Sequence, residues 1–151
     1  MKKSVNEMKL CVLSCSSNES FARAAVAAFI SQLDPTIEEI ADIKTAVSEA
    51  VTNCIVHAYR QTIGYIYITV KLFADNKVQI KIRDSGCGIE NIEQAKEPLF
   101  TTGGDERAGL GFAVMESFMD KLRVNSSVGR GTTITLEKNL ARRVKNNVQS
   151  R

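Results

Sequence analysis

The chain has 151 residues, of which 44% are hydrophobic and 25% are charged, and its formal net charge is +3. This composition is typical of one soluble globular domain with a buried core. No apolar run approaches the roughly 20 residues of a membrane-spanning helix, and the first residues lack the apolar segment of a signal peptide. The four cysteines include no Cys-x-x-Cys pair, and the one histidine is His57. We therefore expect a reduced, cytoplasmic protein without a zinc site.

The C-terminal end of the sequence is basic. We expect one domain over residues 1–140 and a basic tail over residues 141–151. The last fourteen residues contain no acidic residue and five basic ones, namely Lys138, Arg142, Arg143, Lys145 and Arg151. The remaining sequence has no basic stripe with interleaved aromatic residues, so we expect no direct binding to DNA.

The first third of the sequence predicts a strand and then a helix. The strand is expected over residues 9–15. Ser16 and Glu19 have the spacing of a capping box, which predicts the start of the helix, and Asp34-Pro35 predicts its end. Apolar residues recur in this helix at steps of three and four and predict a buried stripe of Phe21, Ala22, Ala25, Val26, Phe29, Ile30 and Leu33.

A second capping box, Thr36 with Glu39, predicts the start of a central helix that extends to Tyr59. At about 100° per residue, Glu49 and Asn53 fall together on the side opposite the apolar stripe. A carboxylate and a carboxamide one turn apart can reach the same small target, although this pattern alone favours a solvated helix face. The stripe itself consists of Ile40, Ile43, Val47, Ala50, Val51, Cys54 and Ala58.

Beyond Gly64 the apolar period changes from that of a helix to that of a strand. Residues 65–72 and 77–83 alternate between apolar and polar side chains, which predicts a hairpin with one dry face. A glycine-rich loop over 84–111, a third helix over 112–119 and a closing hairpin over 122–136 follow. We therefore expect an α+β fold: a two-layer α/β sandwich with helices on one face of a mixed, mostly antiparallel sheet.

Two glycine motifs indicate nucleotide chemistry. Gly109-x-Gly111 directly before a helix leaves backbone N–H groups and the positive end of the helix dipole available to a phosphate. It is neither a Walker A loop nor a dinucleotide fingerprint. Asp84-x-Gly86-x-Gly88 places a carboxylate at a strand end, where it can accept a hydrogen bond from the exocyclic amine of adenine. Taken by itself, the second motif is equally consistent with an ordinary Asp-Gly turn.

In chain order, E-x-x-x-N, D-x-G-x-G, G-x-G and Gly131-Thr132-Thr133 resemble the motifs of the Bergerat-fold (GHKL) ATP-binding superfamily. This superfamily includes gyrases, heat-shock chaperones, histidine kinases and mismatch-repair proteins. Within it, the chain is similar from about Met8 to Leu140 to the sporulation anti-sigma F factors, a family of serine kinases of spore-forming bacteria. The likeness is carried by residues 18–23, 33–36, 48–53, 98–102 and 115–120.

The resemblance implies that the ligands are ATP or ADP and Mg²⁺. Asn53 would hold Mg²⁺, and Glu49 would orient or deprotonate the serine hydroxyl of a protein substrate. Arg107 would neutralise charge on the transferred phosphoryl group, and Thr102 would either cap a helix or contact a phosphate. The adenine would lie against Asp84, Gly86, Gly88 and Thr132. The phosphates would lie against the backbone of Gly109, Leu110 and Gly111.

The resemblance also implies two protein partners and a homodimer. The chain would bind a sporulation sigma F factor, keep it from RNA polymerase, and phosphorylate a serine of an anti-anti-sigma factor. Arg23 is the candidate docking residue on the first helix, and the exposed sheet face would form the homodimer.

Three alternatives stay open at this point. One is a nucleotide-gated anti-sigma clamp with little kinase activity, which the pair Gly103-Gly104 in a shortened loop favours and Glu49 disfavours. The others are the general-stress anti-sigma kinase and a detached histidine-kinase catalytic domain.

Overall fold

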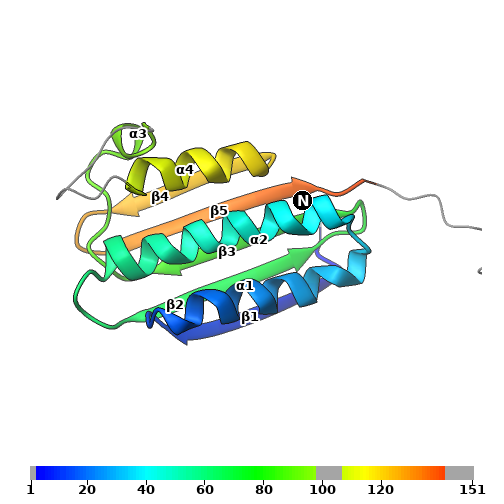
Figure 1. Ribbon diagram of the computed structural model, residues 1–151, viewed down its shortest axis with the longest axis horizontal. Helices are drawn as coiled ribbons and strands as arrows, with labels where there is room; N and C mark the ends of the chain where they lie inside the picture. Colours follow the sequence, from blue (N-terminus) through cyan, green and yellow to red (C-terminus); the bar gives the residue numbers. More distant parts are fainter. Residues whose placement is uncertain (1–2, 98–106, 142–151) are drawn as a thin grey trace, which may run out of the picture.

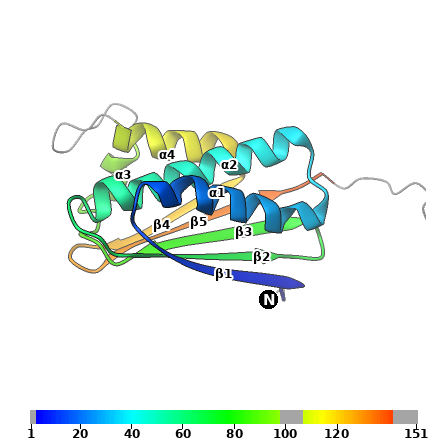
Figure 2. The same cartoon turned by 60° about the horizontal axis from the view of Figure 1, so that its bottom comes forward.

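The computed structural model describes residues 3–97 and 107–141, and for residues 107–110 it describes the backbone alone. Five strands form one sheet in the order β1-β2-β3-β5-β4, and all neighbouring strands in it are antiparallel. The strands are β1 (Asn6–Leu13), β2 (Tyr65–Leu72), β3 (Lys77–Asp84), β4 (Lys121–Ser127) and β5 (Gly131–Asn139). The main helices, α1 (Ser17–Ile30), α2 (Ile37–Thr52) and α4 (Arg107–Phe118), all cover the same face of this sheet (Figures 1 and 2).

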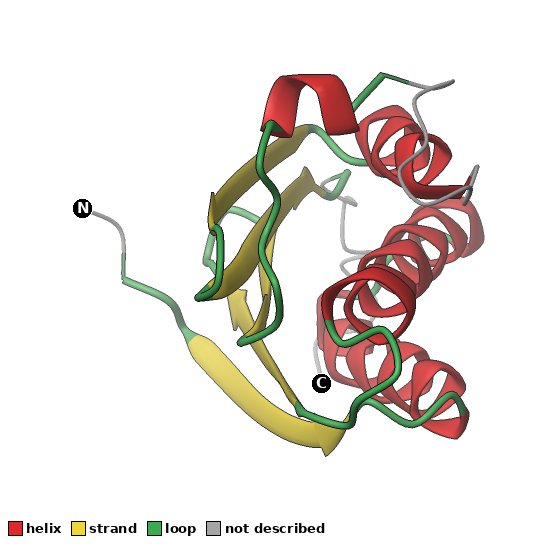
Figure 3. Ribbon diagram, turned by 90° about the vertical axis from the view of Figure 1, so that its left-hand side faces the viewer, coloured by secondary structure: helices red, strands yellow, loops and turns green. Residues whose placement is uncertain are grey.

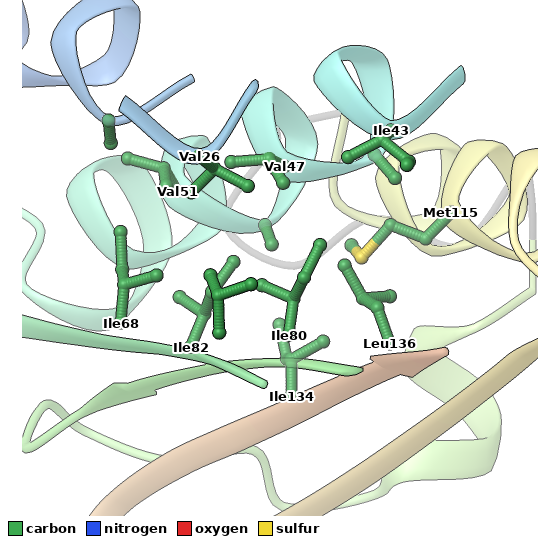
Figure 4. Packing of buried hydrophobic residues seen from close by; sticks show 14 of the residues in the cluster. Val26, Ile43, Val47, Val51, Ile68, Ile80, Ile82, Met115, Ile134 and Leu136 are labelled. Atoms are coloured by element: carbon green, nitrogen blue, oxygen red, sulfur yellow. The ribbon is translucent and has the colours of Figure 1, made fainter. Parts of the chain in front are cut away.

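The predicted two-layer α+β fold is confirmed, and Figure 3 shows the helical layer on one side of the curved sheet. Because neighbouring strands are paired in register, the alternating apolar residues of β2, β3 and β5 project together toward the helices. Ile80, Ile82 and Ile134 of the sheet meet Val47 of α2 and Met115 of α4 there (Figure 4). Within the described part of the chain, no helix is long and apolar enough to cross a bilayer.

The opposite face of the sheet is mostly polar and carries a row of cations. One residue from each strand lies in this row, in which cations alternate with threonines: Lys9, Thr69, Lys81, Thr135 and Arg123. We call this set the cationic row. No helix of the described chain covers it (Figure 3).

The two predicted capping boxes have different outcomes. At the start of α2, Glu39 N donates to Thr36 Oγ1 at 3.0 Å and Thr36 N donates to Glu39 Oε1 at 2.8 Å, which confirms the second box. The first box is wrong, because the Ser16 side chain makes no capping hydrogen bond. Glu19 instead accepts hydrogen bonds from Arg23 and from the Ser48 hydroxyl of α2, and a charge-assisted bond outweighs a neutral cap.

The helix boundaries also differ from the prediction. The first helix ends at Ile30, and a 3-10 turn, η1 (Ser31–Leu33), leads to Asp34 in the left-handed conformation with φ 53°. The central helix ends at Thr52 and continues as a π-helical segment, η2 (Asn53–Ala58). A short helix, α3 (Ile92–Ala95), lies in the predicted glycine-rich loop, and α4 starts before the predicted residue 112. The first strand begins and ends earlier than expected, so that Cys15 lies outside it.

The π-helical segment changes which residue of the central helix is buried. Tyr59 N donates to Cys54 O at 3.1 Å, a step of five residues. The wider turn advances the helix face by one residue, so Tyr59 is buried at 8% exposure and the predicted Ala58 is only partly buried. The Tyr59 hydroxyl donates to Tyr65 O at 2.6 Å and accepts from Ser85 N at 2.7 Å. It therefore fixes the end of β3 against η2.

Candidate functional site

A cavity of about 840 Å³ opens where η2, α3 and the ends of β3 and β5 meet, at the left end of the molecule in Figure 1. Four residues predicted for a nucleotide site line it: Asn53, Asp84, Gly88 and Thr132. Apolar walls are supplied by Val56, Ile89, Ala95, Phe112, Val128 and Ile134. A concave, largely apolar space with a few polar groups is the usual form of a small-molecule site.

The floor of the cavity is polar because three adjacent strands end in polar residues that point inward. Asp84 of β3 pairs with Thr132 of β5, which in turn pairs with Ser126 of β4. The Ser126 and Thr132 hydroxyls are 2.7 Å apart, and Ile89 N donates to Ser126 Oγ at 2.7 Å. These bonds connect the D-x-G-x-G turn to the last hairpin.

Asp84 is a buried carboxylate at 4% exposure. Its Oδ1 accepts hydrogen bonds from Gly86 N at 2.9 Å and from Thr132 N at 3.2 Å. Burial raises the pKa of Asp84 above its ordinary value, and it raises the pKa of the Cys54 thiol well above its own. The fixed position of Asp84 makes it suited to accept a hydrogen bond from a ligand amine.

The glycines of the turn are required where the backbone passes close to its neighbours. Gly88 has φ +80°, and a Cβ there would lie 2.2 Å from Ser127 O. Gly86 packs against Ala58, whose carbonyl would be 2.4 Å from an added Cβ. It therefore lies behind Asp84 and supports the carboxylate through its N–H. Among the two predicted turn glycines, only Gly88 lines the cavity.

Glu49 and Asn53 converge on α4, as their shared helix side predicts. A Cβ placed on Gly111 would lie 3.3 Å from Glu49 Oε1 and 3.3 Å from Asn53 Oδ1. Asn53 Nδ2 is buried without a hydrogen-bond partner among the described residues, and such a group is satisfied when a ligand supplies an acceptor. Glu49 lies beside the cavity and does not line it.

The side-chain oxygen of Asn53 is of the kind that hard divalent cations prefer. No group of three or more His, Cys, Asp or Glu side chains capable of binding a metal occurs in the described ranges. Asn53 Oδ1 fits Mg²⁺, which binds proteins through one or two oxygen ligands and takes its other ligands from phosphates and water.

Some predicted site residues cannot be placed. Thr102 lies outside the described residues, as do the side chains of Arg107 and Leu110. Gly109 is part of the first turn of α4, and Gly111 is buried in the same helix.

The structure adds residues that were not predicted for this site. His57, Arg60 and Cys87 line the cavity, together with Glu90, Asn91 and Gln94 before and within α3. Ser126 was missed as well, although its signal was present: it has the same strand parity as Leu122 and Val124, so it faces inward.

Arg23, the predicted docking residue, is hydrogen-bonded to the central helix α2. Its Nη1 donates to Glu19 Oε2 and to Ser48 Oγ, both at 3.0 Å. Its side chain is still 37% exposed. Arg23 therefore connects α1 with the residue next to Glu49 and also presents a charged group on the surface.

Comparison with known sequences shows extensive similarity. A profile of the histidine kinase-like ATPase domain matches residues 16–138. The chain is 60% identical over 139 residues to an anti-sigma F factor of Caldanaerobacter subterraneus subsp. tengcongensis, covering 91% of this chain and 96% of the relative. It is 54% identical over 137 residues to an anti-sigma F factor of Priestia megaterium, covering 89% and 93%.

Solved structures show the same fold at lower identity. The structure of the RsbU and RsbW domains of Rv1364c from Mycobacterium tuberculosis matches with a TM-score of 0.69 at 22% identity, over 93% of this chain and 34% of that chain. The catalytic domain of histidine kinase ThkA matches with a TM-score of 0.53 at 18% identity, over 89% and 97%. The sequence profile and the curated relatives together show that this chain belongs to the histidine kinase-like ATPase domain family and, within it, to the anti-sigma F factors.

Proposed function

We propose that this chain is an anti-sigma factor and an ATP-dependent protein serine kinase. It binds a sporulation sigma F factor, which keeps that factor from RNA polymerase, and it transfers the γ-phosphoryl group of ATP to a serine of an anti-anti-sigma factor in the cytoplasm. Relatives named anti-sigma F factor, at 52–61% identity over nearly their whole length, support this proposal.

The observation that carries the enzymatic part is the convergence of Glu49 and Asn53 on Gly111, beside a cavity that Asp84 lines. ATP has an amine at one end and a charged polyphosphate at the other. Asp84 accepts a hydrogen bond from the adenine amine, with Gly88 and Thr132 beside it. In the first turn of α4 the backbone N–H of Gly109 donates to the phosphates, and Leu110 and Gly111 follow it in the same helix.

The chemistry is divided between two helix residues and one arginine. Mg²⁺, when bound, would supply positive charge that neutralises the phosphates. Asn53 would hold this ion through Oδ1, and its Nδ2, which is buried without a hydrogen-bond partner among the described residues, would donate to a phosphate oxygen. Glu49 would accept the proton of the substrate serine while the serine oxygen attacks the γ-phosphorus, the bond from the γ-phosphorus to the β,γ-bridging oxygen breaks, and ADP leaves. Arg107 stabilises the charge on the phosphoryl group during transfer.

The partners dock on α1, where the side chain of Arg23 is partly exposed. The two partners compete for this surface, so that phosphorylation of the anti-anti-sigma factor favours capture of the sigma factor. Two copies of the chain pack through the sheet face that bears the cationic row. Since this face is cationic, salt that screens repulsion between the copies strengthens the dimer.

The test is incubation of the purified chain with γ-labelled ATP, Mg²⁺ and a candidate anti-anti-sigma protein. We expect label on a serine of the partner. Glu49→Ala should retain Mg·ADP affinity and lose at least about 100-fold in transfer rate, the contribution typical of a general base. Asn53→Ala should weaken Mg·ATP about tenfold or more, because a charge-assisted contact is lost. Glu38→Gln, on the exposed side of the same helix, is the matched control and should change neither property.

Each outcome of these experiments decides a different part of the proposal. Transfer by Glu49→Ala at the unmodified rate would remove the general-base assignment. Nucleotide binding without label on the partner would leave a nucleotide-gated anti-sigma clamp. Absence of binding to both ADP and ATP in calorimetry would overturn the nucleotide site.

A further inference from the structure

Ser126 is an inward-facing residue of β4 that lies behind the cavity without lining it, and no step of the proposed reaction uses it. Its hydroxyl is hydrogen-bonded to three groups around the cavity floor: Ile89 N, Gly131 O and Thr132 Oγ1. We propose that Ser126 fixes the direction of the Thr132 hydroxyl and thereby sets the preference of the site for a purine with an amino group at position 6. This inference rests on the proposed nucleotide-binding function and deepens it.

The Ser126 hydroxyl has one hydrogen to donate and two lone pairs with which to accept. Ile89 N donates to Ser126 Oγ at 2.7 Å, which uses one lone pair. Ser126 Oγ donates to Gly131 O at 3.0 Å, and this bond uses its hydrogen because a carbonyl oxygen can only accept. Ser126 Oγ and Thr132 Oγ1 are 2.7 Å apart. Since Ser126 has no second hydrogen, Thr132 is the donor in this pair.

The direction of the Thr132 hydroxyl decides what the cavity floor offers to a ligand, because Thr132 lines the cavity. Its one hydrogen is directed to Ser126, so its hydroxyl meets a ligand as an acceptor. Asp84, its partner on the adjacent strand, is a carboxylate and also an acceptor. Gly86 N and Thr132 N hold Asp84 Oδ1 at 2.9 and 3.2 Å. The floor therefore presents two neighbouring side-chain acceptors in fixed positions.

Two purines that differ at position 6 should respond differently to such a floor. Adenine has an N–H₂ group there, whose two hydrogens match two acceptors. Hypoxanthine has a carbonyl oxygen there, which both acceptors repel. Without the Ser126 hydroxyl, Thr132 can turn its hydrogen toward the cavity and donate to that oxygen. Removal of this hydroxyl should therefore lower the discrimination between the two bases rather than the affinity for nucleotides in general.

The experiment is calorimetric titration of the full chain with Mg·ADP and with Mg·IDP, the inosine analogue. The unmodified chain should bind ADP more tightly. Ser126→Ala should reduce the ADP-to-IDP affinity ratio roughly threefold to tenfold, the value of one hydrogen bond. Ser126→Thr keeps the hydroxyl and should restore the ratio, whereas Ser126→Cys, a weak donor of similar size, should give a value between the two. Ser127→Ala, on the exposed face of the same strand, is the matched control and should leave the ratio unchanged.

A double-mutant cycle tests whether Ser126 acts through Thr132. Thr132→Val removes the hydroxyl and keeps the branched shape of the side chain. In this background Ser126→Ala should not change the ADP-to-IDP ratio further, because no hydroxyl remains to be oriented. A further fall as large as that in the unmodified background would show that Ser126 acts by another route, and it would overturn the inference.

Two other results would overturn it as well. One is equal weakening of both nucleotides by Ser126→Ala, which is the signature of a packing role, and the other is failure of Ser126→Thr to restore the ratio. Amide hydrogen exchange in the nucleotide-free chain supplies a test without a ligand. Ser126→Ala should speed exchange at Ile89, whose N–H loses its acceptor, and unchanged protection there would refute the positioning role. If the unmodified chain binds neither nucleotide, the proposed function fails, and exchange at Ile89 distinguishes this result from failure of the Ser126 contacts.

Discussion

Gly111 is the position at which the convergence of Glu49 and Asn53 can be tested most directly. It lies inside α4, where glycine is about 1 kcal/mol less favourable than alanine. The methyl group of Gly111→Ala would contact Glu49 Oε1 and Asn53 Oδ1, each at 3.3 Å. Both atoms belong to the ends of side chains, so a shift of a few tenths of an ångström relieves the contact. We therefore expect the free energy of unfolding to be unchanged or to rise by up to about 1 kcal/mol.

The same methyl group should impair the site. It would occupy the space that the two oxygens share, and it would displace Asn53 from the proposed ion and phosphates. Loss of a contact to a charged group corresponds to about 1.5–3 kcal/mol, so Mg·ADP should bind roughly 10- to 150-fold more weakly. Stability is measured by urea unfolding and affinity by calorimetry.

Ala113→Gly in the same helix is the control for backbone effects. It should lower the free energy of unfolding by about 1 kcal/mol and leave nucleotide affinity unchanged. Unaltered Mg·ADP affinity in Gly111→Ala would contradict the placement of the ion and phosphates beside this glycine. A loss of stability above about 2 kcal/mol would contradict the contact geometry.

Three further substitutions test the floor of the cavity and the helix caps. Asp84→Asn keeps an acceptor for Gly86 N but places a donor toward adenine, so Mg·ADP affinity should fall at least about tenfold. Burial raises the pKa of Asp84 in the folded state, so the free energy of unfolding falls as pH rises through that pKa. Asp84→Asn removes this ionisation, so its gain in Tm over the unmodified chain should be largest at neutral pH and should vanish in acid. A Tm difference independent of pH would rule this explanation out. Thr36→Ala should lower the free energy of unfolding by about 1 kcal/mol, whereas Ser16→Ala should change it by less than about 0.5 kcal/mol, since its hydroxyl caps nothing.

Much of the fold follows from local pattern. The period-2 alternation over 65–72 and 77–83 marks β2 and β3 because one face of each strand must be dry. The same alternation extends beyond the residues on which the prediction was based. Asp84, Thr132 and Ser126 continue the inward-facing positions of β3, β5 and β4. A polar residue at an inward position near a strand end is thus a readable signal of a site.

The remaining features depend on contacts between distant segments. Glu19 leaves the cap position because Ser48, far away in sequence, offers a better partner. The π-helical segment depends on Tyr59, whose hydroxyl is held by Tyr65 and Ser85. The spacing of apolar residues along the helix predicts neither arrangement, because both depend on tertiary packing.

The cationic row has a consequence for the edges of the sheet. Lys9 and Arg123 lie on β1 and β4, the two strands whose outer edges have no neighbour in the sheet. An unprotected edge is a template on which strands of other molecules can add, and lysine or arginine on such a strand opposes that addition by electrostatic repulsion. Lys9 and Arg123 on the two edge strands therefore oppose aggregation of the protein at high concentration.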